Sequence, residues 1–303
     1  MQFTPIASTT VLLLLANVEG CGFNMIIDFQ VTSNCNMNCK YCFDILKEVQ
    51  EKSIADALAS LDILVQAGIT GIVITGGEPL LYHGVKELCH RAKELGLYVY
   101  LSTNGSFFNE THFEMLGLLD CIGLPIDSTD NHLHRILGRP ENQLNITFDC
   151  IASIRKVNSK AQIKIGTVVT ALNYNDLESL GNMLQYVLSD RDVWRLYEFN
   201  PIGNGERNRD FLLLEHAKFT EAIKNLKNKY TFNISPMSIS DSICGYIFVS
   251  PDMHLLAYDS ATFKDYGALE SLGVSETRKI LLRDMFDISE KSRKNRGWIN
   301  EDL

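Results

Sequence analysis

The stretch MIIDFQVTSNCNMNCKYCF, residues 25–43, decides how the rest of the chain is interpreted. Its first eight residues, 25–32, are rich in β-branched and aromatic side chains and predict a strand. Cys35, Cys39 and Cys42 follow, with gaps of three and two residues that suit a loop rather than one face of a helix. A structural zinc site normally has four protein ligands, and no nearby Cys or His offers a fourth. Three thiolates suit a four-iron cluster, because they leave one iron open to a substrate or cofactor.

The composition is that of an ordinary globular protein with one catalytic domain. The 303 residues are 46% hydrophobic and 21% charged, and a chain of this length is near the upper limit for one hydrophobic core. The net charge of −9 gives no basic field to attract a nucleic-acid backbone. We therefore expect a small-molecule substrate and no polynucleotide.

The remaining cysteines indicate a reducing compartment. They are scattered singly, unlike the framework of a disulfide-rich secreted protein, at Cys21, Cys89, Cys121, Cys150 and Cys244. The apolar run 11–16 has no preceding Lys or Arg and no small-residue cleavage pattern, so it does not predict a signal peptide. No stretch approaches the length of a transmembrane helix. We expect a cytoplasmic protein without a membrane association.

From residue 25 onward, strand-like and helix-like segments alternate. This order predicts an α/β protein with a parallel sheet. The predicted strands are 25–32, 71–75, 97–102, 121–126, 161–169 and 194–199. The predicted helices are 53–67, 85–95, 111–119, 145–157 and 175–188. We interpret residues 25–205 as a partial (βα)6 TIM-like barrel, preceded by a lead-in at 1–24.

The remainder, residues 206–303, predicts an α+β extension on the substrate side of the barrel. A helix is expected over 215–226, and alternation around Ser250-Pro251-Asp252 predicts a hairpin over 245–258. The tail from residue 267 is more polar and is expected to be helical in part. A tail of this kind could also cover the active site as a lid.

Each conspicuous polar motif follows a predicted strand. Parallel βα-barrels carry their chemistry in these loops, so we expect the motifs to share one end of the barrel. In chain order they are the cysteine loop, Gly76-Gly77-Glu78-Pro79, Thr103-Asn104-Gly105 and Asp127-Ser128.

The cysteine motif, with Tyr41 just before Cys42, and the later Gly-Gly-Glu-Pro resemble the motifs of the radical S-adenosylmethionine (SAM) superfamily. The resemblance covers residues 25–205. It implies a [4Fe–4S] cluster on Cys35, Cys39 and Cys42, with the amino and carboxylate groups of SAM on the fourth iron. A one-electron donor such as flavodoxin or ferredoxin would then drive cleavage of SAM to methionine and a 5′-deoxyadenosyl radical.

The motifs can also be interpreted physically. Gly76 and Gly77 allow the backbone to approach a ligand closely, while Glu78 can hold the loop or complement a positive charge. Thr103 and Asn104 offer a hydroxyl and an amide for SAM, although both residue types also cap local turns. The SAM-binding set predicted from these motifs and the resemblance is Tyr41, Gly76, Gly77, Glu78, Pro79, Thr103, Asn104, Asp127, Ser128 and Arg139.

A finer resemblance is to the viperin-like radical SAM enzymes. They carry a similar Asp-Ser-x-Asp run followed by Gly-Arg, here residues 127–130 and 138–139. Residues 164–169, 194–199 and 245–249 are also similar, with Gly166 in place of Asn and Arg195 in place of Lys. The resemblance implies that Arg139 meets the SAM carboxylate. It assigns Lys164 and Arg195 to a nucleotide phosphate, and Lys164 and Tyr246 to the catalytic residues.

These features predict a radical SAM enzyme acting on a nucleotide. In the viperin-like version, the product is a 3′-deoxy-3′,4′-didehydro nucleotide with a role in antiviral or antiphage defence. An alternative is modification of another small metabolite or of a peptide without an auxiliary cluster, because Cys244 is the only cysteine after Cys150. An alternative of another class is a non-catalytic iron–sulfur or zinc protein.

Overall fold

The strands of the described part of the chain form one ten-stranded sheet with the order β10-β9-β8-β1-β2-β3-β4-β5-β6-β7. The computed structural model describes residues 25–43, 46, 48–239, 246–259 and 262–296. From β1 to β7 the neighbours are parallel; β8 is parallel to β1, and β9 and β10 continue antiparallel. The strands are β1 Ile26–Thr32, β2 Gly71–Gly76, β3 Tyr98–Ser102, β4 Cys121–Pro125, β5 Gln162–Val169, β6 Val193–Glu198, β7 Asn233–Met237, β8 Tyr246–Val249, β9 His254–Asp259 and β10 Thr262–Ala268.

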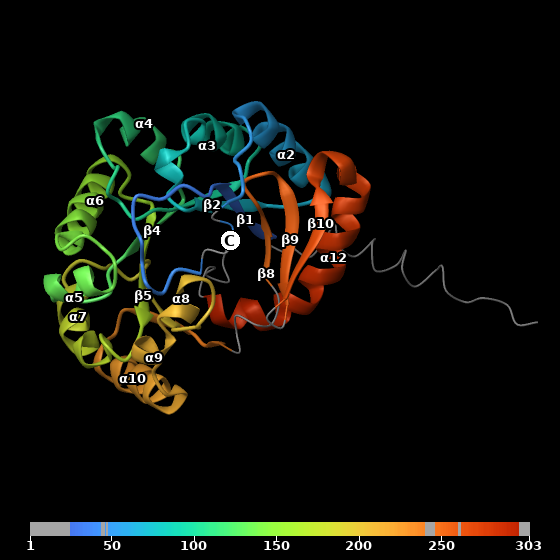
Figure 1. Cartoon of the computed structure of the whole chain (residues 1–303). Coiled ribbons are helices and arrows are strands. Elements are labelled where there is room, and N and C mark those ends of the chain that lie inside the picture. Colours follow the sequence, from blue (N-terminus) through green and yellow to red (C-terminus); the bar gives the residue numbers. More distant parts are fainter. Residues whose placement is uncertain (1–24, 44–45, 47, 240–245, 260–261, 297–303) are drawn as a thin grey trace, which may run out of the picture.

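Most of the helices surround the curved sheet on its outer side, whereas α8 lies within the ring of strands in this view (Figure 1). The helices are α2 Ile54–Ala67, α3 Val85–Glu94, α4 Phe113–Leu116, α5 Asn131–Ile136, α6 Gln143–Val157, α7 Leu177–Leu184, α8 Asn204–Arg207, α9 Arg209–Leu212, α10 His216–Lys229 and α12 Leu269–Arg296. Short 3₁₀ turns are η1 Pro79–Leu81, η2 Glu110–His112 and η3 Tyr174–Asp176. Helix α2 shows why the predicted bounds were accurate: Ser53 and Asp56 form a capping box, and Gly68 ends the helix at φ 112°.

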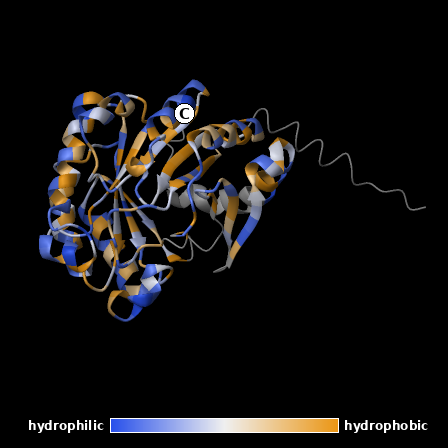
Figure 2. Cartoon of the chain, turned by 45° about the horizontal axis from the view of Figure 1, so that its top comes forward, coloured by the Kyte–Doolittle hydropathy of each residue, from blue (hydrophilic) through white to orange (hydrophobic). Residues whose placement is uncertain are grey.

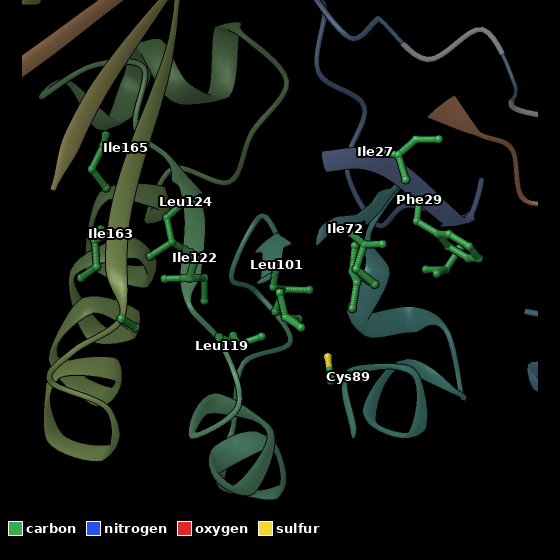
Figure 3. Packing of buried hydrophobic residues seen from close by; sticks show 14 of the residues in the cluster. Ile27, Phe29, Ile72, Cys89, Leu101, Leu119, Ile122, Leu124, Ile163 and Ile165 are labelled. Carbon is green, nitrogen blue, oxygen red and sulfur yellow. The ribbon is translucent and has the colours of Figure 1, made fainter. Parts of the chain in front are cut away.

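The hydrophobic core lies between the sheet and these helices. Successive side chains of a strand point to opposite faces, and in β1 Ile27, Phe29 and Val31 are buried while the residues between them are half-buried. Figure 3 shows that outward-facing side chains of β1 to β5 pack in one layer, including Ile72 and Ile163. Figure 2 shows hydrophilic residues on the outer surfaces of the helices. The alternate, inward-facing residues are therefore left for the barrel interior.

The predicted partial barrel is confirmed, with one strand more than expected. β7 continues the parallel series beyond β6 and contains Pro236. A proline has no N–H to donate, so it is tolerated on an edge strand such as β7 and weakens the sequence signal for a strand. Residues 203–209, which follow the last predicted strand, form α8 and the start of α9.

The C-terminal segment adds strands to both edges of the sheet. The predicted hairpin is confirmed as β8 and β9, which join the sheet beside β1, while β7 extends the opposite edge. Helix α12, interrupted at Gly273, packs against α2, where Arg278 donates to the backbone oxygens of Gln66 at 2.6 Å and Ala67 at 3.3 Å. The division at residue 206 and the covering of the substrate side stay predictions. In the described ranges, no helix is long and apolar enough to cross a membrane.

Candidate active site

The two glycines of Gly-Gly-Glu-Pro let this loop lie directly against the segment that leads into the cysteines. Gly77 donates to the Thr32 oxygen at 2.8 Å, and Glu78 donates to the Asn34 oxygen at 2.8 Å. A Cβ on Gly77 would stand 2.3 Å from the Asn34 oxygen; one on Gly76 would stand 2.3 Å from the Thr32 oxygen, and Gly76 has φ +146°. No side chain fits at either position, so both glycines are required by the chain's own backbone.

The cysteine loop is held from a second side by the segment after α5. Lys40 donates its backbone N–H to the Leu137 oxygen at 2.9 Å. Gly138 has φ +87°, and a Cβ there would stand 2.2 Å from the Asn38 oxygen and 3.0 Å from Cys39 Cα. The predicted Gly-Arg motif therefore has two parts: its glycine fits the cysteine loop, and Arg139 enters the site.

A third contact comes from α8, which the sequence analysis did not identify. Asn204 donates its backbone N–H to the Cys42 oxygen at 3.0 Å and its side-chain amide to the Cys39 oxygen at 2.8 Å. Asn208 donates its side-chain amide to the Lys40 oxygen at 3.0 Å. The only signal was the richness of residues 203–208 in Gly and Asn. Asn204 and Asn208 thus fix the carbonyls of Cys39, Lys40 and Cys42.

The three cysteines supply the thiolate ligands that an iron–sulfur cluster takes. Cys35 is exposed, Cys39 and Cys42 are half-buried, and all three lie on the same loop outside any disulfide. The Cys35 sulfur accepts from the Met37 N–H at 3.4 Å. In the part of the chain that the structure describes, no three His, Cys, Asp or Glu side chains gather closely enough to hold one metal ion. A four-iron cluster is larger, and its thiolate ligands stand farther apart.

Glu78 joins the second loop to the third. The side chain is fully buried and accepts from the Thr103 hydroxyl at 2.6 Å, the Asn104 N–H at 2.7 Å and the Leu80 N–H at 3.0 Å. Burial raises the pKa of the Glu78 carboxyl, and these hydrogen bonds partly oppose that rise. The Asn104 amide also donates to Asn36 of the cysteine loop at 2.9 Å. Of the two functions considered for Glu78, holding the loop matches its contacts.

Arg139 is held by a buried acidic partner. Its Nε lies 2.5 Å from Asp127 Oδ2 and 2.6 Å from the Tyr41 oxygen, and the Tyr41 hydroxyl donates to Asp127. The other carboxylate oxygen accepts from the Val168 N–H at 3.0 Å. Arg139 Nη1 lies 3.8 Å from Met37 Sδ, so the guanidinium reaches towards the cysteine loop. Asp127 and Tyr41 therefore orient Arg139.

The remaining predicted residues occupy separate positions. Ser128 is buried and donates to Asp176 at 2.6 Å, while Pro79 begins η1. Lys164 and Arg195 are almost fully buried on β5 and β6. Only the backbone of Tyr246 is described, as the first residue of β8, so its side chain lies outside the described part. The structure brings together the four motif loops, which are the cysteine loop and residues 76–79, 103–105 and 127–128. The binding roles assigned to their residues stay predictions.

Lys164 stands among aromatic rings in the barrel interior. Its Nζ lies 5.2 Å from the Tyr100 ring centroid and 6.0 Å from that of Tyr197, distances at which a cation is attracted to a ring face. Gly123 pairs with Lys164 in the sheet, and a Cβ there would stand 2.2 Å from the Tyr100 hydroxyl. Gly166 likewise lies beside Tyr197, and a Cβ added to Gly166 would stand 3.3 Å from the Tyr197 ring. Glycines on β4 and β5 thus make room for these tyrosines.

Residues 29–184, about half of the chain, match the family model described as the radical SAM superfamily. The chain belongs to the radical SAM superfamily. This confirms the predicted resemblance, and it makes the protein an enzyme whose cofactors are a [4Fe–4S] cluster and SAM. Cys35, Cys39 and Cys42 are the residues that fit the cluster.

Curated relatives and solved structures resemble this radical SAM enzyme over most of its length. The S-adenosylmethionine-dependent nucleotide dehydratase of Flammeovirga pacifica is 28% identical, with 74% of this chain and 79% of that protein covered. A protein of the same name from Psychrobacter lutiphocae is 26% identical, with 75% and 80% covered. Streptococcus suis SuiB bound to S-adenosylmethionine has a TM-score of 0.62, with 16% identity, 80% of this chain and 62% of that chain covered. anSMEcpe with bound AdoMet has a TM-score of 0.61, with 16% identity and 91% and 84% covered.

The arrangement assigns distinct tasks to the protein's own residues. When bound, the cluster and SAM supply the 5′-deoxyadenosyl radical of this superfamily. Three segments contact the cysteine loop and fix the positions of its thiols: the Gly-Gly-Glu-Pro loop, the segment after α5, and α8. Asp127 and Tyr41 hold the Nε end of Arg139. Its planar guanidinium matches the shape of a carboxylate such as that of SAM. Lys164 and Arg195 place two positive charges on the inner faces of β5 and β6.

Replacing Gly138 by Ala is expected to displace the cysteine loop, because the new Cβ overlaps the Asn38 oxygen. Iron content after anaerobic reconstitution and the visible absorbance of the cluster should fall. Gly96→Ala is the matched control: Gly96 also has positive φ, +75°, but nothing stands within 4 Å of the added Cβ. The control should lose about 1 to 2 kcal/mol of stability through backbone strain and keep its iron. Equal iron in both variants would contradict the contact.

Asp127→Asn is expected to destabilise the protein and to weaken SAM binding, because Arg139 loses its buried counter-charge. Loss of one partner of a buried pair costs about 3 to 5 kcal/mol. Asp62→Asn is the matched control, since the Asp62–Arg91 pair is 39% and 38% exposed and such surface pairs contribute about 0 to 1 kcal/mol. Denaturant unfolding and calorimetric SAM titration measure the two effects. Similar losses in both variants would contradict the special role of Asp127.

His134 is expected to make the free energy of unfolding depend on pH. Its buried Nε2 faces the N–H groups of Asp127 at 3.4 Å and Ser128 at 3.3 Å, and burial lowers the pKa of the imidazole. The unfolded chain therefore takes up this proton first, near pH 6.5, and stability is lost as the pH falls below that value. The stability advantage of the wild type over His134→Gln should shrink between pH 7.5 and pH 5.5. Unfolding free energies at the two pH values test this, and a constant difference would contradict it.

Proposed function

We propose that this radical SAM enzyme dehydrates a nucleoside triphosphate. The observation that carries the proposal is the pair of buried cations, Lys164 and Arg195, on the inner faces of adjacent strands β5 and β6. Two cations held at neighbouring inward positions can form charge-assisted hydrogen bonds with a polyphosphate. The relatives named nucleotide dehydratases support the same substrate class.

The proposed reaction removes one water from the ribose. The 5′-deoxyadenosyl radical takes the 4′ hydrogen and becomes 5′-deoxyadenosine, and the 3′ hydroxyl leaves with a proton as water. One electron reduces the remaining substrate radical, and a double bond forms between C3′ and C4′. A second electron is needed earlier to cleave SAM. Both come from a one-electron donor of the flavodoxin or ferredoxin class.

The test uses anaerobically reconstituted protein with dithionite and SAM. Each of the four nucleoside triphosphates is added separately, and 5′-deoxyadenosine and nucleotide mass are followed. We expect at least one triphosphate to accelerate 5′-deoxyadenosine formation and to yield a product one water lighter. If none of the four does so, the nucleotide proposal is wrong, and a panel of other metabolites and peptides is the next measurement.

Lys164→Met and Arg195→Met are expected to raise the KM for the active triphosphate. Each charge-assisted contact contributes about 1.5 to 3 kcal/mol, which corresponds to a rise of roughly 10- to 150-fold. The effect should be smaller with the nucleoside monophosphate, which presents less charge. Lys156→Met, at an exposed position of α6, is the control and should leave the KM unchanged. A KM equal to that of the wild type in both Lys164→Met and Arg195→Met would show that these cations do not bind the substrate.

The resemblance also carries a proposal about biological role. A modified nucleotide of this kind would stop chain elongation by a viral polymerase, because it lacks the 3′ hydroxyl. Expression of the enzyme in a bacterial host is therefore expected to lower phage plaque counts, and Cys39→Ala should abolish that protection. Equal plaque counts with the wild type and this variant would contradict a defence role.

A further inference from the structure

Four aromatic side chains pack together beside the last cysteine of the cysteine loop. Phe43 follows Cys42 directly, and its ring centroid lies 5.6 Å from that of Tyr258 and 6.3 Å from that of Phe263. The Phe263 ring lies 4.7 Å from Tyr258 and 6.2 Å from Phe248. Rings at these separations stabilise one another. We call Phe43, Phe248, Tyr258 and Phe263 the aromatic wall.

The sheet register places the wall on the inner side of the barrel. The outward residues of β1 belong to the core beneath the helices, so Asp28 faces the interior. Phe248 pairs with Asp28 in parallel register, and paired residues share a face. Leu256 pairs with Phe248, Tyr258 lies two residues further along β9, and Phe263 pairs with Tyr258. All three strand residues of the wall therefore face the same side as Asp28.

The wall has a buried layer and an exposed layer. Phe248 is 0% exposed and Tyr258 is 2% exposed, whereas Phe43 is 37% and Phe263 is 38% exposed. The two buried rings support the two exposed ones, so the exposed ring surfaces are held in place. Aromatic ring surface that stays exposed on the inner side of the barrel is typical of a ligand-binding surface.

The wall and the buried cations face the barrel interior from different sides. β8, β9 and β10 lie on one side of the ring of strands, and β5 lies on the other (Figure 1). Lys164 and Arg195 therefore offer positive charge opposite a surface that offers aromatic rings. A nucleotide carries the two matching parts, an anionic phosphate chain and a flat aromatic base, at its two ends.

We propose that the aromatic wall binds the nucleobase of the substrate by stacking on Phe43 and Phe263. This inference rests on the proposed function and extends it by assigning the place of the base. A base stacked on an aromatic side chain gains about 1 to 3 kcal/mol, and every base has a π face that can stack. The wall thus supplies affinity without choosing among the four bases, and any choice comes from polar groups elsewhere.

The test measures nucleotide binding by the holoenzyme with oxidised cluster and SAM, by equilibrium dialysis. Phe263→Ala should raise the dissociation constants of ATP, CTP, GTP and UTP by similar factors, roughly 5- to 100-fold for a lost stacking contact. Ribose 5-triphosphate, which has no base, should bind the wild type and Phe263→Ala equally. Phe263→Leu, which keeps apolar bulk without a π face, should behave like Phe263→Ala, whereas Phe263→Trp should bind all four nucleotides as the wild type does.

Two controls separate stacking from structural damage. Tyr186→Ala removes an 86% exposed ring after α7 and should leave nucleotide binding unchanged. Iron per protein should be the same in every Phe263 variant as in the wild type. If Phe263→Ala loses iron, nucleotide binding is compared between the wild type and Phe263→Leu instead, because leucine keeps most of the side-chain volume.

The possible outcomes decide between this inference and the proposed function. If the wild type binds no nucleotide, both are overturned. If the wild type binds nucleotides and Phe263→Ala and Phe263→Leu bind them equally well, only the stacking inference is overturned. A weaker binding of SAM, with unchanged nucleotide binding, would assign the wall to the adenine of SAM and would also overturn the inference.

Discussion

The site depends on backbone contacts to a loop that has almost no regular structure of its own. A loop without a helix or strand must find partners for its N–H and C=O groups elsewhere, or it will not hold one shape. Here the partners come from three other segments, at Glu78, Leu137 and Asn204, and glycines at 77 and 138 allow the chains to meet without a side chain between them. The positions of the cysteine thiols are therefore set by residues distant in sequence.

The barrel divides its residues between stability and chemistry by strand alternation. Outward residues such as Ile27 and Ile163 pack under the helices, which leaves the inward positions free to be polar. Those inward positions include Asp28, Lys164 and Arg195, which would be unfavourable in the outer layer. Gly123 and Gly166 leave room for the rings of Tyr100 and Tyr197. These rings pack beside Lys164 and fix its surroundings.

Much of the fold was accessible from sequence because local rules dominate there. Ser53 and Gly68 mark α2 by capping chemistry, and β5 is marked by its β-branched run. β7 was missed since Pro236 opposes a strand, and only the edge position makes it acceptable. Asn204 and Asn208 were missed for a related reason: a polar residue in a glycine-rich segment looks like a solvated loop until its partner carbonyls are located.

The sequence by itself determined the repeating βα order, the three cysteines and the glycine-rich second loop, because these features depend on spacing and residue type within short segments. Only the tertiary structure decided how the motif residues divide their tasks. Asp127 and Tyr41 hold Arg139, and Glu78 joins loops, because both carboxylates are buried and must be satisfied by neighbours that lie far along the chain. The aromatic wall is likewise decided by sheet register, which brings Phe263 beside Phe43 across more than two hundred residues of sequence.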